Sequence, residues 1–395
     1  MKKIIFGYAA LLCCALSSCN SKDHTTEVET AAISINPDKL TVINDNGEFA
    51  AACLDTIRFL RLETTDDCLL ADIKKVVESD SLIYVLDELQ GEGKRVFTFD
   101  SNGKFKHQIS KIGQGPDEYS RLQAFAFKSD TLYLLDDYNN KILRFDADGN
   151  FIDKCNNVDL FNIEDIYVLD SEPHILFLTS LNSLNPIVHA VYSPFTDNKC
   201  IPLIENRFDR NESFAGFAAI PPTLATDDGK VIMTAPLSPT VYTVDPKSFD
   251  VNEFITIDCA TEIPAIGENE KYSEFESKIN AATRYSRFPI SVFQTGKWII
   301  ANFYIGAIVF DSTTNSGFIR PNMRSSIESD IFPFDPLSIA GKGSDGSLLA
   351  AMNAESFLSR VNEGSDNMKF MPSKEVLDGL TEVSNPVLIR YKFKN

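Results

Sequence analysis

DSLIYVLDELQGEGKRVFTFDSNGKF, at residues 80–105, returns about fifty residues later as DTLYLLDDYNNKILRFDADGNF, at residues 130–151. Each copy reads as strand, loop, strand, tight Asx-Gly turn and strand. A small sheet of this kind buries both of its faces only by packing against copies of itself. The repeat therefore predicts an all-β fold, the β-propeller, in which such sheets form blades around an axis.

The length of the chain sets the number of blades. One blade takes roughly 40 to 50 residues, so 395 residues provide six blades after about the first fifty and leave no room for a second domain. The strand patterns place the blades at residues 72–110, 122–155, 165–204, 217–258, 290–311 and 337–393. Within these limits, residues 357–361 read as a strand of blade six. Between blades four and five, apolar side chains at helical spacing in residues 269–285 predict an inserted helix.

A propeller must close its ring, because the first and last blades otherwise expose unpaired strand edges. Residues 56–62, TIRFLRL, lie ahead of blade one and have the alternation of a strand. We expect this segment to complete the last blade beside residues 387–393. The predicted fold class is therefore an all-β, six-bladed β-propeller whose N-terminal strand closes the last blade.

The N-terminus has the pattern of an export signal. Lys2 and Lys3 precede an apolar run at residues 4–16, which is too short to span a bilayer. The run LSSC at residues 16–19 resembles the lipobox of bacterial lipoproteins, which implies cleavage after residue 18 and lipidation of Cys19. An ordinary secretory peptide is the alternative. We therefore expect a lipoprotein signal peptide at residues 1–18, a lipidated cysteine with a flexible tether at residues 19–50, and the propeller at residues 51–395.

The charge of the chain narrows the class of partner. Removal of the signal leaves 35 basic and 56 acidic residues, a net charge of −21. A surface this acidic repels nucleic-acid phosphates and anionic lipids. We therefore expect no nucleic-acid partner, and membrane contact through the lipid anchor only. The simpler interpretation is that the charge keeps an exported protein soluble.

No residue pattern indicates a metal, a cofactor or a catalytic centre. The cysteines are widely spaced, although a Cys53–Cys68 pair stays open, and the four histidines lack metal-ligand spacing. GQG at residues 113–115 is not followed by the helix that a phosphate-binding loop needs, so it reads as a tight turn between blades. DADG at residues 146–149 lacks the glutamate that completes an EF-hand loop and reads as a hairpin turn.

KIGQGPDEY at residues 111–119 resembles the Gly-x-Gly-Pro-Gly-Glu-Tyr segment of a family of six-bladed propeller lipoproteins from Gram-negative gut bacteria, itself similar to NHL-type propellers. LRLETT at residues 60–65 and NPVLIRYKF at residues 385–393 extend the resemblance over the chain from about residue 55. Asp117 stands where the family has glycine, so a role that needs a positive φ is in question there. The resemblance implies an exported lipoprotein on the outer membrane or cell surface, and it implies no reaction.

In propellers, the loops between blades and the loops joining the second and third strands of each blade gather on one face, around the channel mouth. We expect a ligand site there, because acidic, basic and aromatic side chains suit sugars or peptides. The candidates are Asp117, Glu118, Tyr119, Asp136, Tyr138, Arg207, Arg210, Tyr304 and Arg324. The leading hypothesis is a monomeric, non-enzymatic binding module for a protein, peptide or glycan partner. The alternative is a polysaccharide hydrolase or lyase that uses acids such as Asp117, Glu118 or Asp136.

Overall fold

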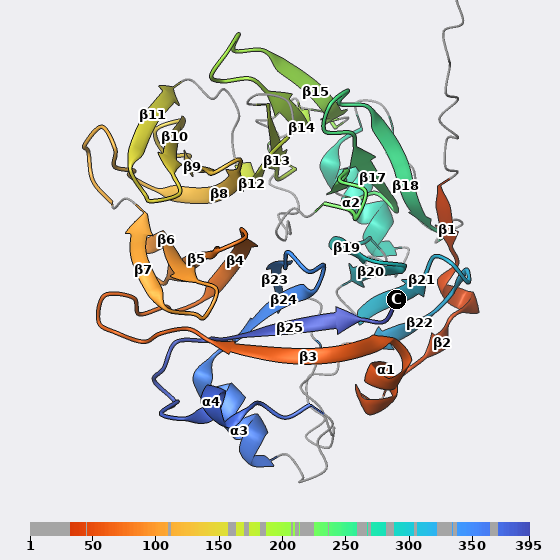
Figure 1. Cartoon of the computed structure of the whole chain (residues 1–395). Coiled ribbons are helices and arrows are strands. Elements are labelled where there is room, and N and C mark those ends of the chain that lie inside the picture. Colours follow the sequence, from red (N-terminus) through yellow and green to blue (C-terminus); the bar gives the residue numbers. More distant parts are fainter. Residues whose placement is uncertain are drawn as a thin grey trace, which may run out of the picture. The chain divides into compact units, whose positions relative to one another are not determined.

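The structure is a computed structural model, and it describes most of the chain from residue 32 onward. The described residues are 32–44, 46–109, 112–156, 163–169, 174–181, 187–206, 208–209, 213, 225–235, 237–258, 267, 270–281, 288–303, 306–321, 334, 338–363 and 370–395. Six small sheets follow one another around a ring (Figure 1). The protein is therefore a six-bladed β-propeller, which confirms the predicted fold class.

Blades one to three are four-stranded antiparallel sheets in which the first strand of each lies innermost in the ring (Figure 1). Blade one contains β4 (Ile73–Glu78), β5 (Leu82–Leu89), β6 (Gly93–Asp100) and β7 (Phe105–Ile109). Blade two contains β8 (Leu122–Lys128), β9 (Thr131–Asp136), β10 (Lys141–Asp146) and β11 (Phe151–Asn156). Blade three contains β12 (Ile163–Val168), β13 (Ile175–Thr179), β14 (Ile187–Tyr192) and β15 (Cys200–Glu205).

Blades four and five each gain an outer strand from the N-terminal segment. Blade four contains β16 (Val231–Thr234), β17 (Thr240–Val244), β18 (Val251–Ile257) and β1 (Ile33–Ile35). Blade five contains β19 (Ser291–Thr295), β20 (Trp298–Phe303), β21 (Gly306–Asp311), β22 (Ser316–Pro321) and β2 (Thr41–Val42). Both added strands are parallel to their neighbours, β18 and β22. The first strand expected in blade four, residues 217–225, lies outside the described residues except for Ala225, which bridges to Val231.

A flexible tether was expected at residues 19–50, and this expectation is wrong for the second half of that segment. Besides β1 and β2, this part of the chain forms the short 3-10 helix η1 (Pro37–Lys39) and the helix α1 (Asn46–Cys53). Phe49 of α1 is fully buried. The short strands carry too few residues to show an alternating pattern, so the polar composition around them dominated the prediction. The propeller domain therefore includes residues well before 51.

Blade six closes the ring as predicted. It contains β23 (Ile339–Lys342), β24 (Leu348–Met352), β25 (Val387–Phe393) and β3 (Leu54–Arg61). β3 is antiparallel to β25, with Phe59 opposite Ile389. The three inner strands thus come from the C-terminal end of the chain, and the outermost strand comes from the N-terminal part.

Two inserted segments are helical, and one of them corrects a predicted strand. Residues 357–361 belong to the helix α3 (Ala354–Glu363) rather than to a strand, because Ala354, Phe357 and Val361 pack against the core at helical spacing. α4 (Lys374–Leu377) follows in the same insertion. The helix α2 (Tyr272–Ala281) confirms the insertion predicted between blades four and five. Among the described residues, none of the helices combines the length and the hydropathy needed to cross a bilayer.

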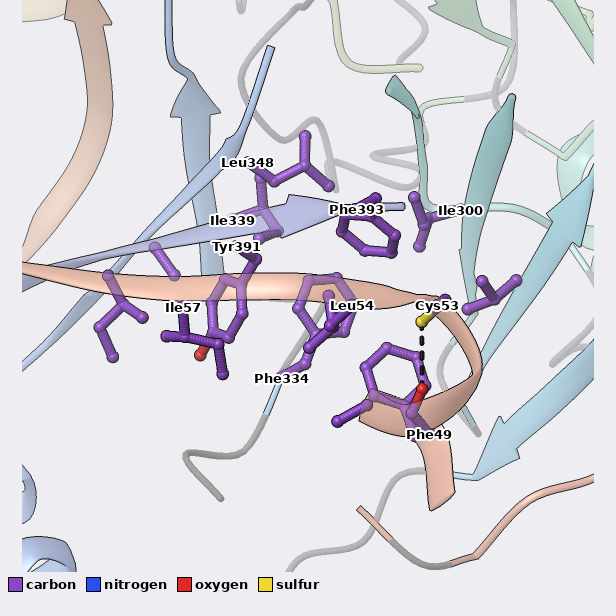
Figure 2. Close-up of a cluster of buried hydrophobic side chains, with 14 of the residues drawn as sticks. Phe49, Cys53, Leu54, Ile57, Ile300, Phe334, Ile339, Leu348, Tyr391 and Phe393 are labelled. Carbon is purple, nitrogen blue, oxygen red and sulfur yellow. Dashed lines mark hydrogen bonds between the residues drawn. The ribbon is translucent and has the colours of Figure 1, made fainter. Parts of the chain in front are cut away.

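Apolar side chains fill the spaces between neighbouring blades. Figure 2 shows the cluster at the closure, where Phe49 and Leu54 lie near Phe334, Tyr391 and Phe393. Phe49 stacks on Phe334 with ring centroids 5.3 Å apart. Each buried aromatic ring contributes a large apolar area, so these clusters supply most of the cohesion of the ring. The closure is therefore held by packing as well as by the hydrogen bonds between β3 and β25.

Cys53 and Cys68 are both buried free thiols, so the structure holds no disulfide between them. The Cys53 thiol donates a hydrogen bond to the Phe49 carbonyl across 3.3 Å, as Figure 2 shows. Burial is the main reason why the pKa of Cys53 lies far above its ordinary value. Both residues therefore serve as small core side chains.

Candidate functional site

The signature turn at residues 112–120 is built around one carboxylate. Glu118 folds back so that its Oε2 accepts a hydrogen bond from the Gly115 backbone N–H across 2.8 Å. A Cβ atom on Gly113 would lie 1.9 Å from the same oxygen, so a larger residue there would displace the Glu118 carboxylate from this position. The Gly113 N–H in turn bonds to the Tyr119 carbonyl across 3.0 Å. The segment is thus the tight inter-blade turn that the sequence predicts, and Asp117 does not adopt a positive φ in it.

Asp136 stabilises the same turn from the end of β9. Its buried carboxylate accepts hydrogen bonds from the backbone N–H groups of Ser120 and Arg121, across 2.8 and 3.2 Å, and from the Asn139 side chain across 2.9 Å. Lys141 Nζ lies 3.4 Å from it. Burial acts to raise the pKa of Asp136, but these hydrogen bonds outweigh it and hold the pKa below its ordinary value. The group therefore stays ionised near neutral pH, which does not suit a catalytic acid.

Asp87 occupies the equivalent position in blade one. Its Oδ1 accepts hydrogen bonds from the N–H groups of Ala71 and Asp72, across 2.7 and 2.9 Å. Its Oδ2 lies 2.6 Å from Arg95 Nη2. The same arrangement at the same place in two blades indicates a repeated structural device that fixes the loop entering each blade.

The structure brings two of the predicted groups of site residues together. Lys141 Nζ donates to the Glu118 carbonyl across 2.7 Å, so the signature turn and the loop after β9 are neighbours. Within this region Asp117 and Tyr138 are exposed, whereas Tyr119 and Asp136 are fully buried and face the protein interior. The other predicted site residues lie outside the described residues: Cys19, Arg207, Arg210, Tyr304 and Arg324.

A cavity of about 220 Å³ lies at the other ends of the inner strands. It is lined by the C-terminal parts of β4, β8, β12 and β23, with Ala225, and we refer to it as the axial cavity. The lining residues are Lys75, Val76, Val77, Glu78, Ala126, Phe127, Ile166, Tyr167, Val168, Ala225, Lys342, Gly343 and Ser344. None of the predicted site residues that the structure describes is among them. The signal available in the sequence was the presence of charged residues in otherwise apolar inner strands, such as Lys75 in β4.

Lys75 links three inner strands. Its Nζ lies 2.6 Å from Asp165 Oδ1 of β12 and donates to the Phe125 carbonyl of β8 across 2.9 Å. Only 7% of the Lys75 side chain and 6% of the Asp165 side chain are exposed. A buried ion pair persists only when its remaining hydrogen-bonding capacity is met, and the Ile166 carbonyl, 3.3 Å away, provides a third acceptor.

The other two charged side chains of the axial cavity are also paired. Glu78 forms a two-pronged ion pair with Arg390, in which Nη1 lies 2.9 Å from Oε2. Lys342 Nζ lies 2.5 Å from Asp227 Oδ1 and 3.3 Å from the Ala225 carbonyl. Because each charged residue described in the lining has an opposite charge beside it, this part of the cavity wall is polar but locally neutral. Phe127, whose ring stacks on Tyr84, and Tyr167 also line this wall.

Comparison with known proteins supports the architecture. The model of one family, described as Domain of unknown function (DUF4934), matches residues 39–392. Among curated proteins, none is significantly similar to this sequence.

A crystal structure of a Bacteroides fragilis protein described as exported is 17% identical, with a TM-score of 0.67 over 92% of this chain and all of that one. A member of the DUF4221 family from Bacteroides vulgatus is 10% identical, with a TM-score of 0.45 over 86% of this chain and 97% of that one. At such low identity, the first similarity supports the fold alone.

Proposed function

This chain belongs to the DUF4934 family, and from that premise we propose that it is an exported, lipid-anchored propeller of the cell envelope that binds a glycan or peptide without transforming it. One group of the ligand, the size of a sugar residue or an amino-acid side chain, enters the axial cavity. The observation that carries the proposal is the cavity itself, with its aromatic and charge-compensated wall.

The size of the axial cavity limits what enters it. A volume of about 220 Å³ is below the roughly 300 to 1,000 Å³ of pockets that enclose a drug-sized ligand. A longer glycan or peptide would therefore place one residue inside and leave the rest at the surface. Rings such as Phe127 and Tyr167 favour the apolar face of a sugar or an apolar side chain. The compensated charges favour an uncharged, hydroxyl-bearing group, because such a group leaves the ion pairs of Lys75, Glu78 and Lys342 intact.

The location rests on the N-terminal pattern. Lipidation of Cys19 would hold the propeller on a membrane surface, and the similar Bacteroides fragilis protein described as exported fits this placement. A polysaccharide hydrolase or lyase is the other function that the sequence leaves open. Of its three named acids, Glu118 and Asp136 already accept hydrogen bonds from backbone N–H groups, which weighs against that function.

The test is a panel of glycans and short peptides, measured by calorimetry against the wild-type protein and a variant with a blocked cavity. Ser344 is exposed and lines the cavity, so Ser344→Trp adds bulk there without removing a core contact. The matched control is Ser101→Trp, at an exposed hairpin position that does not line the cavity. We expect Ser344→Trp to weaken binding of the panel's ligand at least about tenfold and Ser101→Trp to leave it unchanged.

Three other outcomes would change the assignment. Equal affinity for Ser344→Trp and wild type would show that the axial cavity is not the site. Loss of binding on Tyr138→Ala alone would move the site to the loops predicted from the sequence. Turnover of a glycan during the assay, abolished on replacing Asp117, would make the protein an enzyme.

A further inference from the structure

Four large apolar side chains stand exposed on loops of blades six, one and two. Val383 precedes β25, Leu69 precedes β4, Ile112 precedes β8 and Tyr138 follows β9. Their exposed fractions are 83%, 47%, 52% and 70%, respectively. All four loops lie at the N-terminal ends of the inner strands, away from the part of those strands that lines the axial cavity.

Hydrogen bonds join the loops of blades six and one. The Asn385 side chain donates to the carbonyls of Glu63 and Cys68, across 2.6 and 2.8 Å, and accepts from the Leu70 N–H across 2.8 Å. Arg95, at the start of the third strand of blade one, donates to the Leu69 carbonyl across 3.1 Å. The loop carrying Val383 and the loop carrying Leu69 are therefore held side by side.

Further hydrogen bonds continue the contact into blade two. The Tyr119 hydroxyl lies 3.4 Å from the carbonyl of Lys94, which is next to Arg95. The Asn139 side chain donates to Ser120 Oγ across 2.7 Å, which places Tyr138 beside the signature turn. Residues 63–71, 112–121, 137–141 and 378–385 thus form one continuous surface, which we call the loop face.

The loop face is strongly acidic. Its four segments contain eight acidic and two basic residues. Both basic side chains already have acidic partners, since Arg121 forms a two-pronged ion pair with Asp137 and Lys141 lies 3.4 Å from Asp136. Asp66, Asp67, Asp117, Asp378 and Glu382 are exposed. Arg61, outside the four segments, donates to the carbonyls of Asp378 and Gly379. A ligand approaching this face therefore meets apolar side chains among more acidic than basic groups.

We propose that the loop face docks a partner protein through a segment that combines basic and apolar side chains. Exposed apolar anchors gain affinity when a partner removes them from water. The surrounding acids select a basic partner and speed its association. A membrane surface is the less suitable occupant, because anionic lipid headgroups repel the same acids. This surface is separate from the axial cavity, so the inference does not depend on the proposed function.

The test uses three fluorescent peptides of equal length as probes, composed of Lys and Leu, of Lys and Gly, and of Glu and Leu. Binding to the full chain is followed by fluorescence anisotropy at low and at near-physiological salt. We expect the Lys–Leu peptide to bind most tightly, the Lys–Gly peptide to bind at least about tenfold more weakly, and the Glu–Leu peptide not to bind. Added salt should weaken binding of the Lys–Leu peptide.

The variants separate the apolar and the acidic contributions. Replacing Ile112, Tyr138 and Val383 together by Ser should weaken Lys–Leu binding at least about tenfold. Replacing Asp66 and Asp67 by Asn should weaken it less and reduce its salt dependence. The control is a triple serine variant at exposed apolar positions outside the loop face, which are Val42, Ile152 and Met371; it should bind as the wild type does. All these positions are exposed, so the variants should also unfold as the wild type does.

Three results would overturn the proposal. The first is equal binding of the Lys–Leu peptide by the wild type and the loop-face triple variant. The second is equal affinity for the Glu–Leu and Lys–Leu peptides. The third is binding to anionic or zwitterionic lipid vesicles that the loop-face triple variant abolishes, without peptide binding, because that result would assign the surface to a membrane.

Discussion

His189 should make the stability of this propeller depend on pH in the mildly acidic range. The side chain is fully buried on β14, where its Nε2 lies 2.8 Å from the Thr234 carbonyl of blade four. A carbonyl only accepts, so Nε2 carries the proton of the neutral ring, and Nδ1 has no hydrogen-bond partner. A second proton would place a charge in a fully buried site, and the cost of removing that charge from water exceeds what the backbone groups of Thr234 and Val188 return. Burial accordingly lowers the pKa of His189 to about 4.

The size of the effect follows from linkage. An unfolded histidine has a pKa of about 6.5, so between about pH 6.5 and pH 4 the unfolded chain binds a proton that the folded chain does not. The stabilisation is therefore fully present above the unfolded pKa, and it is lost as the pH falls towards the folded value. For a pKa of about 4 in the folded state, the loss between about pH 7 and pH 5 is about 2 kcal/mol.

His189→Gln isolates this contribution. Glutamine keeps a donor near the position of Nε2 and does not titrate. Urea unfolding of both proteins at about pH 7 and about pH 5 gives the two free energies of unfolding. We expect the wild type to lose about 2 kcal/mol more than the variant over this interval. His107 also has a pKa lowered mainly by burial, but it is common to both proteins and cancels in the difference.

Parallel pH curves for the wild type and His189→Gln would refute the reasoning. They would mean that the buried ring accepts a proton in the folded state as readily as in the unfolded state. Unfolding slopes should also agree between the two proteins, since a changed slope would indicate a different unfolding reaction.

Three further substitutions test the structural roles assigned above. Asp136→Asn should cost about 2 to 4 kcal/mol in urea unfolding, whereas Asp137→Asn, which breaks a more exposed ion pair, should cost about 1 kcal/mol or less; similar costs would contradict the turn-fixing role. Gly341→Ala should lower the melting temperature, because the new Cβ would lie 2.0 Å from the Val76 carbonyl oxygen of the neighbouring inner strand, and an unchanged melting temperature would show that the strands can separate. Phe49→Ala should destabilise by about 3 to 5 kcal/mol because this ring is fully buried, and a negligible cost would restore the tether interpretation of α1.

The repeat made the blades predictable, because turn residues and alternation recur at a fixed distance in residues 80–105 and 130–151. Closure of the ring by β3 was also predictable, because residues 56–62 alternate apolar and polar side chains like a strand and have no neighbouring strand in sequence to pair with. The helix α3 was missed because the three apolar residues of the window 357–361, Phe357, Leu358 and Val361, suit a strand and a helix equally. β1 and β2 were missed because a strand of two or three residues has no readable period.

The candidate site was less predictable than the fold. Loop assignment located the neighbourhood of Asp117 and Tyr138, but sequence alone could not show that Asp136 is buried and hydrogen-bonded by the turn beside it. The axial cavity depends on Lys75 and Lys342, which come from strands far apart in the chain. These two residues lie close together because the blades are arranged in a circle, and no local sequence pattern indicates which blades become neighbours.

β3 is synthesised early and its partner strand β25 is synthesised last. β3 therefore cannot pair until synthesis of the chain is almost complete. Residues 54–61 leave the ribosome long before residues 387–393, yet each is the other's neighbour in blade six. During that interval the waiting strand offers an open edge to any other chain. We therefore expect refolding to be slow, as is usual when contacts join distant parts of a chain, and a chain interrupted before its last strand to aggregate rather than to form a five-bladed ring.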